Sequence, residues 1–279
     1  MRRKPEAIDW VGRRGEKWSE RLDEMEAMLA PLNQPLFEQL RLEGPARIAE
    51  VGSGGGATAM DVMRRAPPGS VVHGYDISPA LVEVAQARSR RSQRSIVFEV
   101  ADMSTAAPKH PYDRLVSRFG VMFFDAPHAA FGNLVRWLEP GGRFAFAVWG
   151  PASENPWLTT VRDVVAQVVE VPAPDPEAPG PFRYGNPATL LALLDEAGFS
   201  DLEVHDWRGE LSLGGGLPPA SAAAFALDAF SSFSELLEAA GGTARVQAER
   251  TLETELSKCQ RDGGVRLQAL VRFFTGTKR

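Results

Sequence analysis

The segment RIAEVGSGGGA, residues 47–57, joins a short β-rich run to a turn in which four of five residues are glycine. A helix is predicted directly after it, over residues 57–65. Glycine is needed in such a turn because the chain bends sharply and because a Cβ would keep a ligand away from the backbone. The N-terminus of the following helix offers unpaired N–H groups and partial positive charge to an anion. The segment therefore predicts a ligand-binding turn between a strand and a helix.

Outside this turn, strand-like and helix-like segments alternate. Strands are predicted over residues 70–75, 95–100, 112–119, 143–149, 202–211 and 265–275, and helices over residues 79–91, 127–138 and 187–197. Alternation at this spacing predicts an α/β fold, a mostly parallel sheet with helices on both faces.

Further segments lie around this core. Residues 10–42 have helical periodicity that Pro31 and Pro35 interrupt, which predicts two short helices. Six prolines between residues 172 and 187 predict a surface loop. We expect a single domain over residues 1–279. Its parts would be a helical cap (1–43), a cofactor-binding core (44–150), a lid or loop (151–187) and a C-terminal half (188–279) holding a helical insertion (218–262) and the closing strand.

Composition limits the function classes. The chain has 31 basic and 36 acidic residues, a net charge of -5, which disfavours a nucleic-acid partner because such proteins usually carry a basic face. The one cysteine, Cys259, excludes an intramolecular disulfide and fits a reducing compartment. No uninterrupted apolar run approaches the roughly 18–20 residues of a membrane span, and no apolar segment follows the basic N-terminus. We expect a cytoplasmic protein; the oligomeric state is not predictable.

Acidic residues follow three successive predicted strands. Glu50 precedes the glycine turn, Asp76 closes the second strand twenty residues past Gly56, and Asp102 follows the third. The carboxyl ends of parallel strands line one crevice, and an acid at the second strand end can accept hydrogen bonds from ribose hydroxyls. The same glycine pattern also fits a dinucleotide, so an NAD(P)- or FAD-dependent oxidoreductase stays open, as does a purely structural turn.

Longer motifs carry a resemblance. They are EVGSGGG (50–56), GYDIS (74–78), ADM (101–103), YDRLVSRFGVMFF (112–124), LEPGGRFAFAVW (138–149) and the opening WVGRRGEKWSERLDEMEAMLAPL (10–32). With these motifs the chain resembles the class I S-adenosylmethionine-dependent methyltransferases, in particular the bacterial group related to the ubiquinone/menaquinone-biosynthesis enzymes. The resemblance implies a Rossmann-like sheet of seven strands, parallel except for the last. It also implies S-adenosylmethionine as cofactor and S-adenosylhomocysteine as product.

The resemblance also implies roles for individual residues. Glu50 and the glycines would hold the methionine end of the cofactor, and Asp76 the ribose. Ile77 would pack on adenine, whose edge Asp102 and Met103 would recognise. The implied cofactor residues are Glu50, Gly52, Ser53, Gly54, Gly56, Asp76, Ile77, Asp102, Met103, Ser117, Arg118 and Trp18. Ser53 stands where many members carry cysteine, which matters little if the backbone makes the contact.

Methyl transfer is an in-line displacement that needs alignment and exclusion of water but no metal. An oxygen or carbon acceptor would also need a base, for which the candidates are His73, His110, His128 and His205. Packing or surface roles explain His73 and His128 better, so the candidates for a catalytic role are His110, His205 and Arg118, which can bind a carboxylate of a ligand. Acceptor selection should come from aromatic residues outside the core: Trp10, Trp18, Trp157, Phe182, Tyr184, Phe225, Phe230 and Phe233. These residues favour an apolar or aromatic small-molecule acceptor. A cofactor-binding protein without catalytic activity stays open as an alternative.

Overall fold

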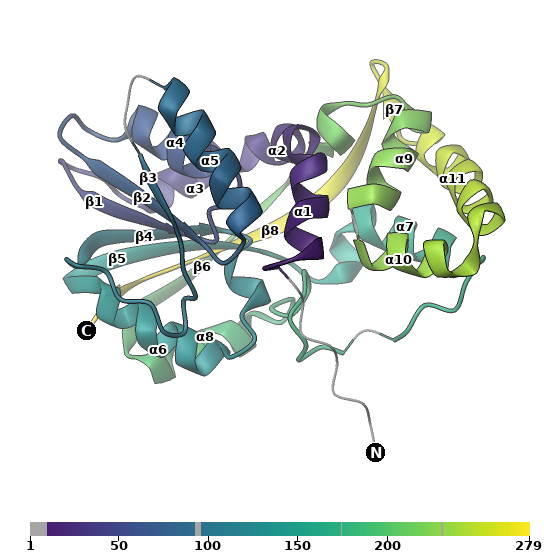
Figure 1. The fold of residues 1–279 in the computed structure, drawn as a ribbon. Helices are drawn as coiled ribbons and strands as arrows, with labels where there is room; N and C mark the ends of the chain where they lie inside the picture. The colour runs from purple at the N-terminus through teal and green to yellow at the C-terminus, as the bar shows by residue number, and fades with distance from the viewer. Residues whose placement is uncertain (1–9, 93–95, 174, 230) are drawn as a thin grey trace.

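The computed structural model describes residues 10–92, 96–173, 175–229 and 231–279 (Figure 1). The strands are β1 (Arg47–Val51), β2 (Val71–Asp76), β3 (Val97–Val100), β4 (Tyr112–Arg118), β5 (Leu138–Trp149), β6 (Phe199–Ser212), β7 (Gln260–Arg261) and β8 (Gly264–Lys278). The α-helices are α1 (Arg13–Glu20), α2 (Leu22–Leu29), α3 (Asn33–Gln39), α4 (Ala57–Arg65), α5 (Pro79–Arg91), α6 (Pro127–Trp137), α7 (Pro156–Val165), α8 (Pro187–Ala197), α9 (Pro219–Ala229), α10 (Ser231–Ala240) and α11 (Gly242–Ser257).

The sheet confirms the predicted fold class. Its strand order is β3-β2-β1-β4-β5-β8-β6, and β8 runs antiparallel to both β5 and β6. One difference is the two-residue strand β7, which pairs with the start of β8 and brings the number of strands in the described residues to eight. β1 lies between β2 and β4, so the strand order reverses beside it. A ligand crevice is expected beyond the carboxyl ends of the strands at such a reversal.

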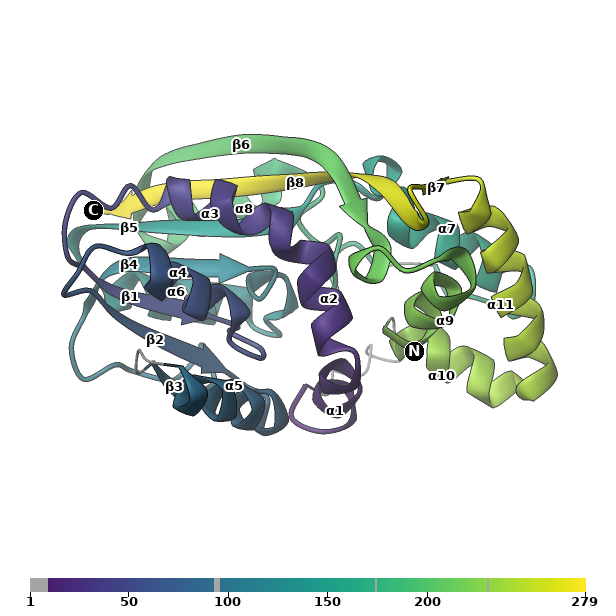
Figure 2. The ribbon, with the colours of Figure 1, turned by 90° about the horizontal axis from the view of Figure 1, so that it is seen from above.

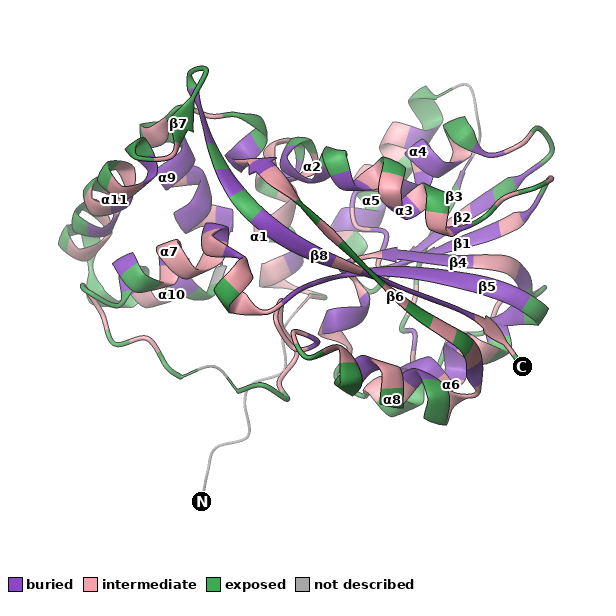
Figure 3. Ribbon diagram, turned by 180° about the vertical axis from the view of Figure 1, so that it is seen from behind, coloured by how far each residue is buried: buried purple, intermediate pink, exposed green. Residues whose placement is uncertain are grey.

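Helices cover both faces of this sheet. In Figure 1, α3, α4 and α5 lie above the sheet, and α6 and α8 lie below it. The covering explains why residues 143–149 of β5, which are largely apolar, are all buried. Figure 3 shows the same burial along the central strands. α5 begins where the sequence predicts, because Ser78 accepts a hydrogen bond from Leu81 N at 3.4 Å and Pro79 occupies the first turn.

A second group of helices lies beside the sheet. Figures 1 and 2 show α7, α9, α10 and α11 together, with the long strands β6 and β8 extending toward them. The sequence did not predict α7, which lies in the region expected to be a lid or loop. The insertion at 218–262, which the sequence predicts to be helical, contains α9, α10 and α11. In the proline-rich segment, residues 172–173 and 175–186 form no helix or strand, and Pro187 begins α8.

The N-terminal helices connect the two parts of the structure. α1 contacts α5 on the sheet side and α9 on the helical side. Arg21, between α1 and α2, forms an ion pair with Asp228 of α9 at 2.6 Å. Lys17 of α1 pairs with Glu238 of α10 at 3.0 Å. The predicted cap is therefore a bridge that closes one side of the space between sheet and helices. In the part of the chain that the structure describes, no helix combines the length and apolarity needed to cross a bilayer.

Candidate functional site

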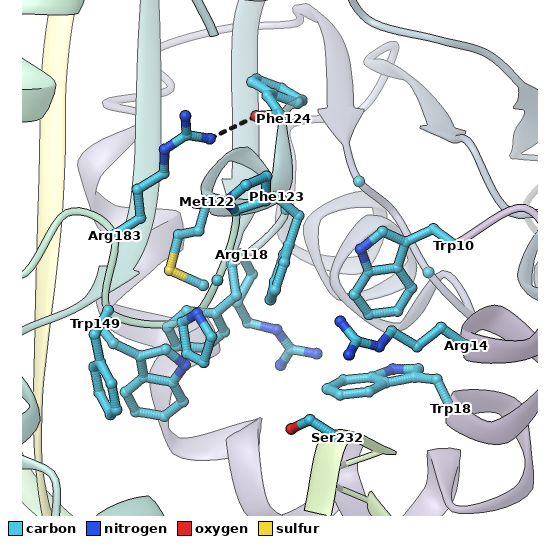
Figure 4. Close-up of a pocket in the computed structure, with 18 of the residues that line it drawn as sticks. Trp10, Arg14, Trp18, Arg118, Met122, Phe123, Phe124, Trp149, Arg183 and Ser232 are labelled. Atoms are coloured by element: carbon cyan, nitrogen blue, oxygen red, sulfur yellow. Dashed lines mark hydrogen bonds between the residues drawn. The ribbon is translucent and has the colours of Figure 1, made fainter. Parts of the chain in front are cut away.

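A cavity of about 1560 Å³ lies between the carboxyl ends of the strands and the helical group. The residues that follow β1, β2, β3, β4 and β5 all contribute to its lining, and α1, α2, α7 and α10 enclose it. Figure 4 shows a part of the cavity into which aromatic and arginine side chains point. Pockets for one drug-sized ligand commonly measure ~300–1,000 Å³. The cavity is therefore large enough for two small molecules side by side.

The glycine turn presents bare backbone to this cavity. Gly52 has φ +69°, and a Cβ there would lie 2.7 Å from the Cα of Gly120, so the turn crosses the chain after β4 at close range. The N–H groups of Gly52 and Ser53 both donate to the carbonyl of Tyr75, at 2.8 and 2.9 Å. Gly54 has φ +50°, and a Cβ there would meet no described protein atom within 4 Å. The space beside Gly54 is thus open to a ligand.

Asp76 connects the turn to the neighbouring strand and helix. Its Oδ2 accepts the N–H of Gly54 at 2.8 Å, and its Oδ1 accepts the N–H of Ser78 at 2.9 Å. Burial raises the pKa of Asp76, and these backbone donors oppose that rise. Next to it, Ile77 lines the cavity with an apolar side chain that is 39% exposed. An exposed isoleucine inside a pocket is suited to a flat apolar ligand surface.

The segment after β3 forms the next wall. Asp102 lines the cavity, and its Oδ1 accepts the N–H of Ser104 at 2.8 Å and the hydroxyl of Ser104 at 2.7 Å. Met103 lines the same wall and is almost fully buried. The predicted residues Asp76, Ile77 and Asp102 are therefore brought together, although they belong to two different strand ends.

Glu50 and Arg118 lie near the glycine turn and influence each other electrostatically. Glu50 is buried and its Oε2 accepts the N–H of Ala59 at 2.7 Å. Burial raises the pKa of Glu50 to about 8, and the positive charge of Arg118 opposes this rise. Burial also lowers the pKa of Arg118, while the carboxylates of Glu50 and Glu26 raise it. Arg118 donates to Asn33 Oδ1 at 2.7 Å, and Figure 4 shows its guanidinium directed into the cavity.

Two of the predicted cofactor residues do not line the cavity. Ser117 is fully buried and donates its hydroxyl to the carbonyl of Val51 at 2.7 Å, so it connects β4 to β1 and does not face a ligand. Adjacent residues of a strand point to opposite faces, so Arg118 and Ser117 cannot both face the cavity. Gly56 faces the sheet, where a Cβ would lie 2.6 Å from the ring of Phe98.

The histidine candidates lie elsewhere. His110 is exposed in the segment before β4, and His205 on β6 has its Nε2 3.4 Å from Glu203 Oε2. His73 accepts or donates a 2.6 Å hydrogen bond with the Tyr112 hydroxyl, and His128 is exposed. All four histidines are described, and none is part of the cavity lining. Of the three catalytic candidates, only Arg118 reaches the cavity.

Aromatic rings line a second part of the cavity, which we call the aromatic half. Phe119 stacks on Trp149 with centroids 4.2 Å apart and planes 9° apart, and Trp149 lies 4.5 Å from Trp157. On the other side, Trp10 meets Phe123 at 5.1 Å. Phe119 has φ +67°, an unfavourable backbone conformation for a phenylalanine, which commonly occurs at functional sites.

Most of the aromatic residues that the sequence indicated do line the cavity. They are Trp10, Trp18, Trp157, Phe182 and Phe233. Phe225 and Tyr184 belong to the buried core, and Phe230 lies outside the described residues. The sequence reasoning missed Phe119, Trp149 and Arg14. Phe119 and Trp149 could have been predicted from their position, since each lies at the end of a predicted strand.

Comparison with known proteins places these features in a wider group. A family model described as "Methyltransferase domain" matches residues 49–146. The chain is similar to the demethylmenaquinone methyltransferase of Thermus thermophilus, at 30% identity over 168 residues, which are 57% of this chain and 76% of that protein. It is also similar to malonyl-(acyl-carrier protein) O-methyltransferase 1 of Ilyobacter polytropus, at 33% identity over 103 residues. That match covers 37% of this chain and only 38% of the Ilyobacter protein.

A solved structure shows the same fold. Phosphoethanolamine N-methyltransferase 2 of Haemonchus contortus, in complex with S-adenosyl-L-methionine, superposes with a TM-score of 0.59 at 17% sequence identity. The superposition covers 97% of this chain and 59% of that chain. The chain therefore shares its overall fold with a protein of known structure.

Proposed function

Because the chain belongs to the S-adenosylmethionine-dependent methyltransferases, we propose that it transfers a methyl group from S-adenosylmethionine to a small-molecule acceptor. One observation of the structure carries the proposal. Glu50, Asp76 and Asp102 lie at or just beyond the carboxyl ends of three successive strands and line one cavity together with the open backbone of Gly54. Strand-end carboxylates with a purely structural role are not expected to line the same cavity.

The cofactor fits the part of the cavity that is lined by the glycine turn, Asp76 and Asp102, which we call the turn-side half. Ser53 has a buried hydroxyl without a hydrogen-bond partner in the described residues, and the space beside Gly54 would be filled by any side chain. Both features indicate that a polar ligand belongs at the turn. We place the ribose on Asp76, the adenine on Ile77 with its edge at Asp102, and the methionine end by the glycine turn and Arg118. Trp18 would cover the cofactor from α1.

The chain contributes alignment and exclusion of water to the reaction. Bound S-adenosylmethionine supplies an electrophilic methyl group, and S-adenosylhomocysteine remains when the acceptor has taken it. Asp76 already holds the turn by two backbone hydrogen bonds, so it is preorganised to accept from a ligand hydroxyl as well. The rings of Phe119, Trp149 and Trp157 line the acceptor half and keep water from the reacting groups. These rings support an apolar or aromatic acceptor.

The other functions that fit the sequence receive less support. The oxidoreductase alternative shares the glycine turn, but the family model and the similar proteins are methyltransferases. Turnover of an acceptor separates the active enzyme from a cofactor-binding scaffold. The expected cytoplasmic location, the expected lack of a nucleic-acid partner and the division of the chain into cap, core, lid and C-terminal half form part of this proposal.

Calorimetric titration tests the proposed function. We expect micromolar binding of S-adenosylmethionine and S-adenosylhomocysteine, and none of NAD(H), NADP(H) or FAD. The variant Asp76→Asn keeps one acceptor oxygen and should lose at least about tenfold in affinity for S-adenosylhomocysteine, the size of one charge-assisted hydrogen bond. Asp113→Asn is the matched control, because Asp113 also accepts a backbone N–H, that of Arg47 at 2.7 Å, but lies outside the cavity. Binding of a dinucleotide without binding of S-adenosylhomocysteine contradicts the proposal.

A further inference from the structure

Arg14 forms no ion pair with any described residue. It lies on α1 and lines the cavity, and Figure 4 shows its guanidinium pointing inward between Trp10 and Trp18. Within the described residues, no hydrogen bond or ion pair to Arg14 is formed. Burial lowers the pKa of Arg14, and the carboxylate of Glu235 on α10 raises it. A guanidinium in an apolar setting is costly unless an anion accepts its hydrogen bonds.

The other cations of the lining differ from Arg14 in this respect. Lys17, Arg118, Arg162 and Arg183 each donate a hydrogen bond to a protein oxygen, at distances from 2.5 to 3.1 Å. These four side chains therefore have roles in holding the structure together. Among the lining cations described, Arg14 is the one that makes no hydrogen bond to a described residue, so all of its N–H groups remain for a ligand.

Arg14 is held in place by the packing of α1. The next residue, Gly15, lies so close to α5 that a Cβ there would be 2.2 Å from the hydroxyl of Ser78 and 2.5 Å from the carbonyl of Trp10. The backbone that carries Arg14 is thus fixed against the N-terminus of α5. An arginine on a fixed backbone loses less entropy when it binds a ligand, which favours a specific role over a flexible surface one.

The charges around the two arginines separate their roles. Glu50 and Glu26 act on the pKa of Arg118, which places Arg118 at the glycine turn. Glu235, from the helical group, acts on the pKa of Arg14. Arg118 is therefore the arginine beside the glycine turn. Arg14 lies beside the aromatic rings, because Trp10, which flanks it, meets Phe123 at 5.1 Å.

We propose that Arg14 binds a carboxylate of the acceptor, so that the substrate class is a planar apolar molecule bearing a carboxylate. This inference rests on the proposed function, because it assigns the acceptor half of the same cavity. A guanidinium binds a carboxylate through two parallel hydrogen bonds. Trp10 flanks that group and supplies a flat apolar surface for the rest of the molecule.

The test uses probes of equal shape and different charge. The full chain, saturated with S-adenosylhomocysteine, is titrated with benzoate and naphthoate and with their neutral counterparts benzamide and naphthamide. We expect at least one acid to bind roughly 10- to 100-fold more tightly than its amide, the range of one or two hydrogen bonds to a charged group. Arg14→Gln should abolish this preference. Arg261→Gln, an exposed arginine on β7 outside the cavity lining, should keep it.

The outcomes separate this inference from the proposed function. Failure of the wild-type chain to bind S-adenosylhomocysteine refutes the proposed function itself, and is measured before any acid is added. Normal binding of S-adenosylhomocysteine with no acid preferred over its amide, or with the preference intact in Arg14→Gln, overturns the role of Arg14. A loss of S-adenosylhomocysteine affinity in Arg14→Gln, with the acid preference unchanged, assigns Arg14 to the cofactor and also overturns it. The thermal midpoint of each variant shows that it is folded.

Discussion

Two alanine substitutions in the glycine turn should affect different properties: Gly52→Ala mainly the stability of the fold, and Gly54→Ala mainly the affinity for the cofactor. In Gly52→Ala, the new Cβ would lie 2.7 Å from the backbone of Gly120, which cannot move away without shifting the end of β4. The φ of +69° adds left-handed strain of about 1–2 kcal/mol, and overpacking costs about 1–3 kcal/mol. We expect a total loss of about 2–5 kcal/mol and a thermal midpoint lowered by about 3–9 °C.

In Gly54→Ala, the strain at φ +50° is similar, but the new methyl group meets no described protein atom within 4 Å. The loss should therefore stay near about 1–2 kcal/mol. The methyl group would instead occupy the space that we assign to the cofactor, so affinity for S-adenosylhomocysteine should fall at least about tenfold. Differential scanning fluorimetry and calorimetry measure the two effects separately. Wild-type affinity in Gly54→Ala would refute the assignment of the turn, and equal stability of both variants would refute the close crossing with Gly120.

Three further predictions concern other parts of the molecule. The pKa of Glu50 is about 8 in the folded chain against an ordinary 4.5, so the folded state holds an extra proton and stability should fall as pH rises from about 4.5 to 8. In Glu50→Gln, the thermal midpoint should fall less steeply with rising pH than in the wild-type chain. The same pH dependence in both proteins would contradict the argument that burial raises the pKa of Glu50. His110→Ala and His205→Ala should retain cofactor affinity and turnover, because both lie outside the cavity; a tenfold loss in either would disprove the placement. Asp228→Ala removes the ion pairs of Asp228 with Arg21 and with Arg245 of α11, whereas Arg245→Ala removes only the second. Asp228→Ala should cost up to about 1 kcal/mol more than Arg245→Ala, seen as faster hydrogen exchange in α9; equal exchange in the two variants would show that the pair with Arg21 does not hold the bridge.

The turn-side half of the cavity could be predicted from the sequence because its parts are local. A strand, a turn and an acid follow one another within a few residues, and helices 57–65 and 79–91 have the predicted bounds. Ser117 shows the limit of that reasoning, since the sequence locates the strand end correctly but not the side of the strand that meets the ligand. The direction of a side chain depends on strand register, and here it is Arg118 that faces the cavity.

The aromatic half could not be assembled from the sequence because its residues come from distant segments. Trp10, Phe123 and Phe233 meet at one cavity only after the sheet, the N-terminal helices and the insertion have packed together. The helix α7 was missed for a local reason. Prolines near it favour a loop at first reading, but Pro156 occupies the first turn of the helix, where a proline is favourable.

A crystal structure of the chain with S-adenosylhomocysteine would test the central claim most directly. We expect the adenine on Ile77, the ribose hydroxyls on Asp76 and the sulfur directed toward the rings of Phe119 and Trp149. The carboxylate of the product should lie at the glycine turn with Arg118, and Arg14 should remain available. A ligand bound away from these residues, or with its carboxylate on Arg14, would contradict the proposed site.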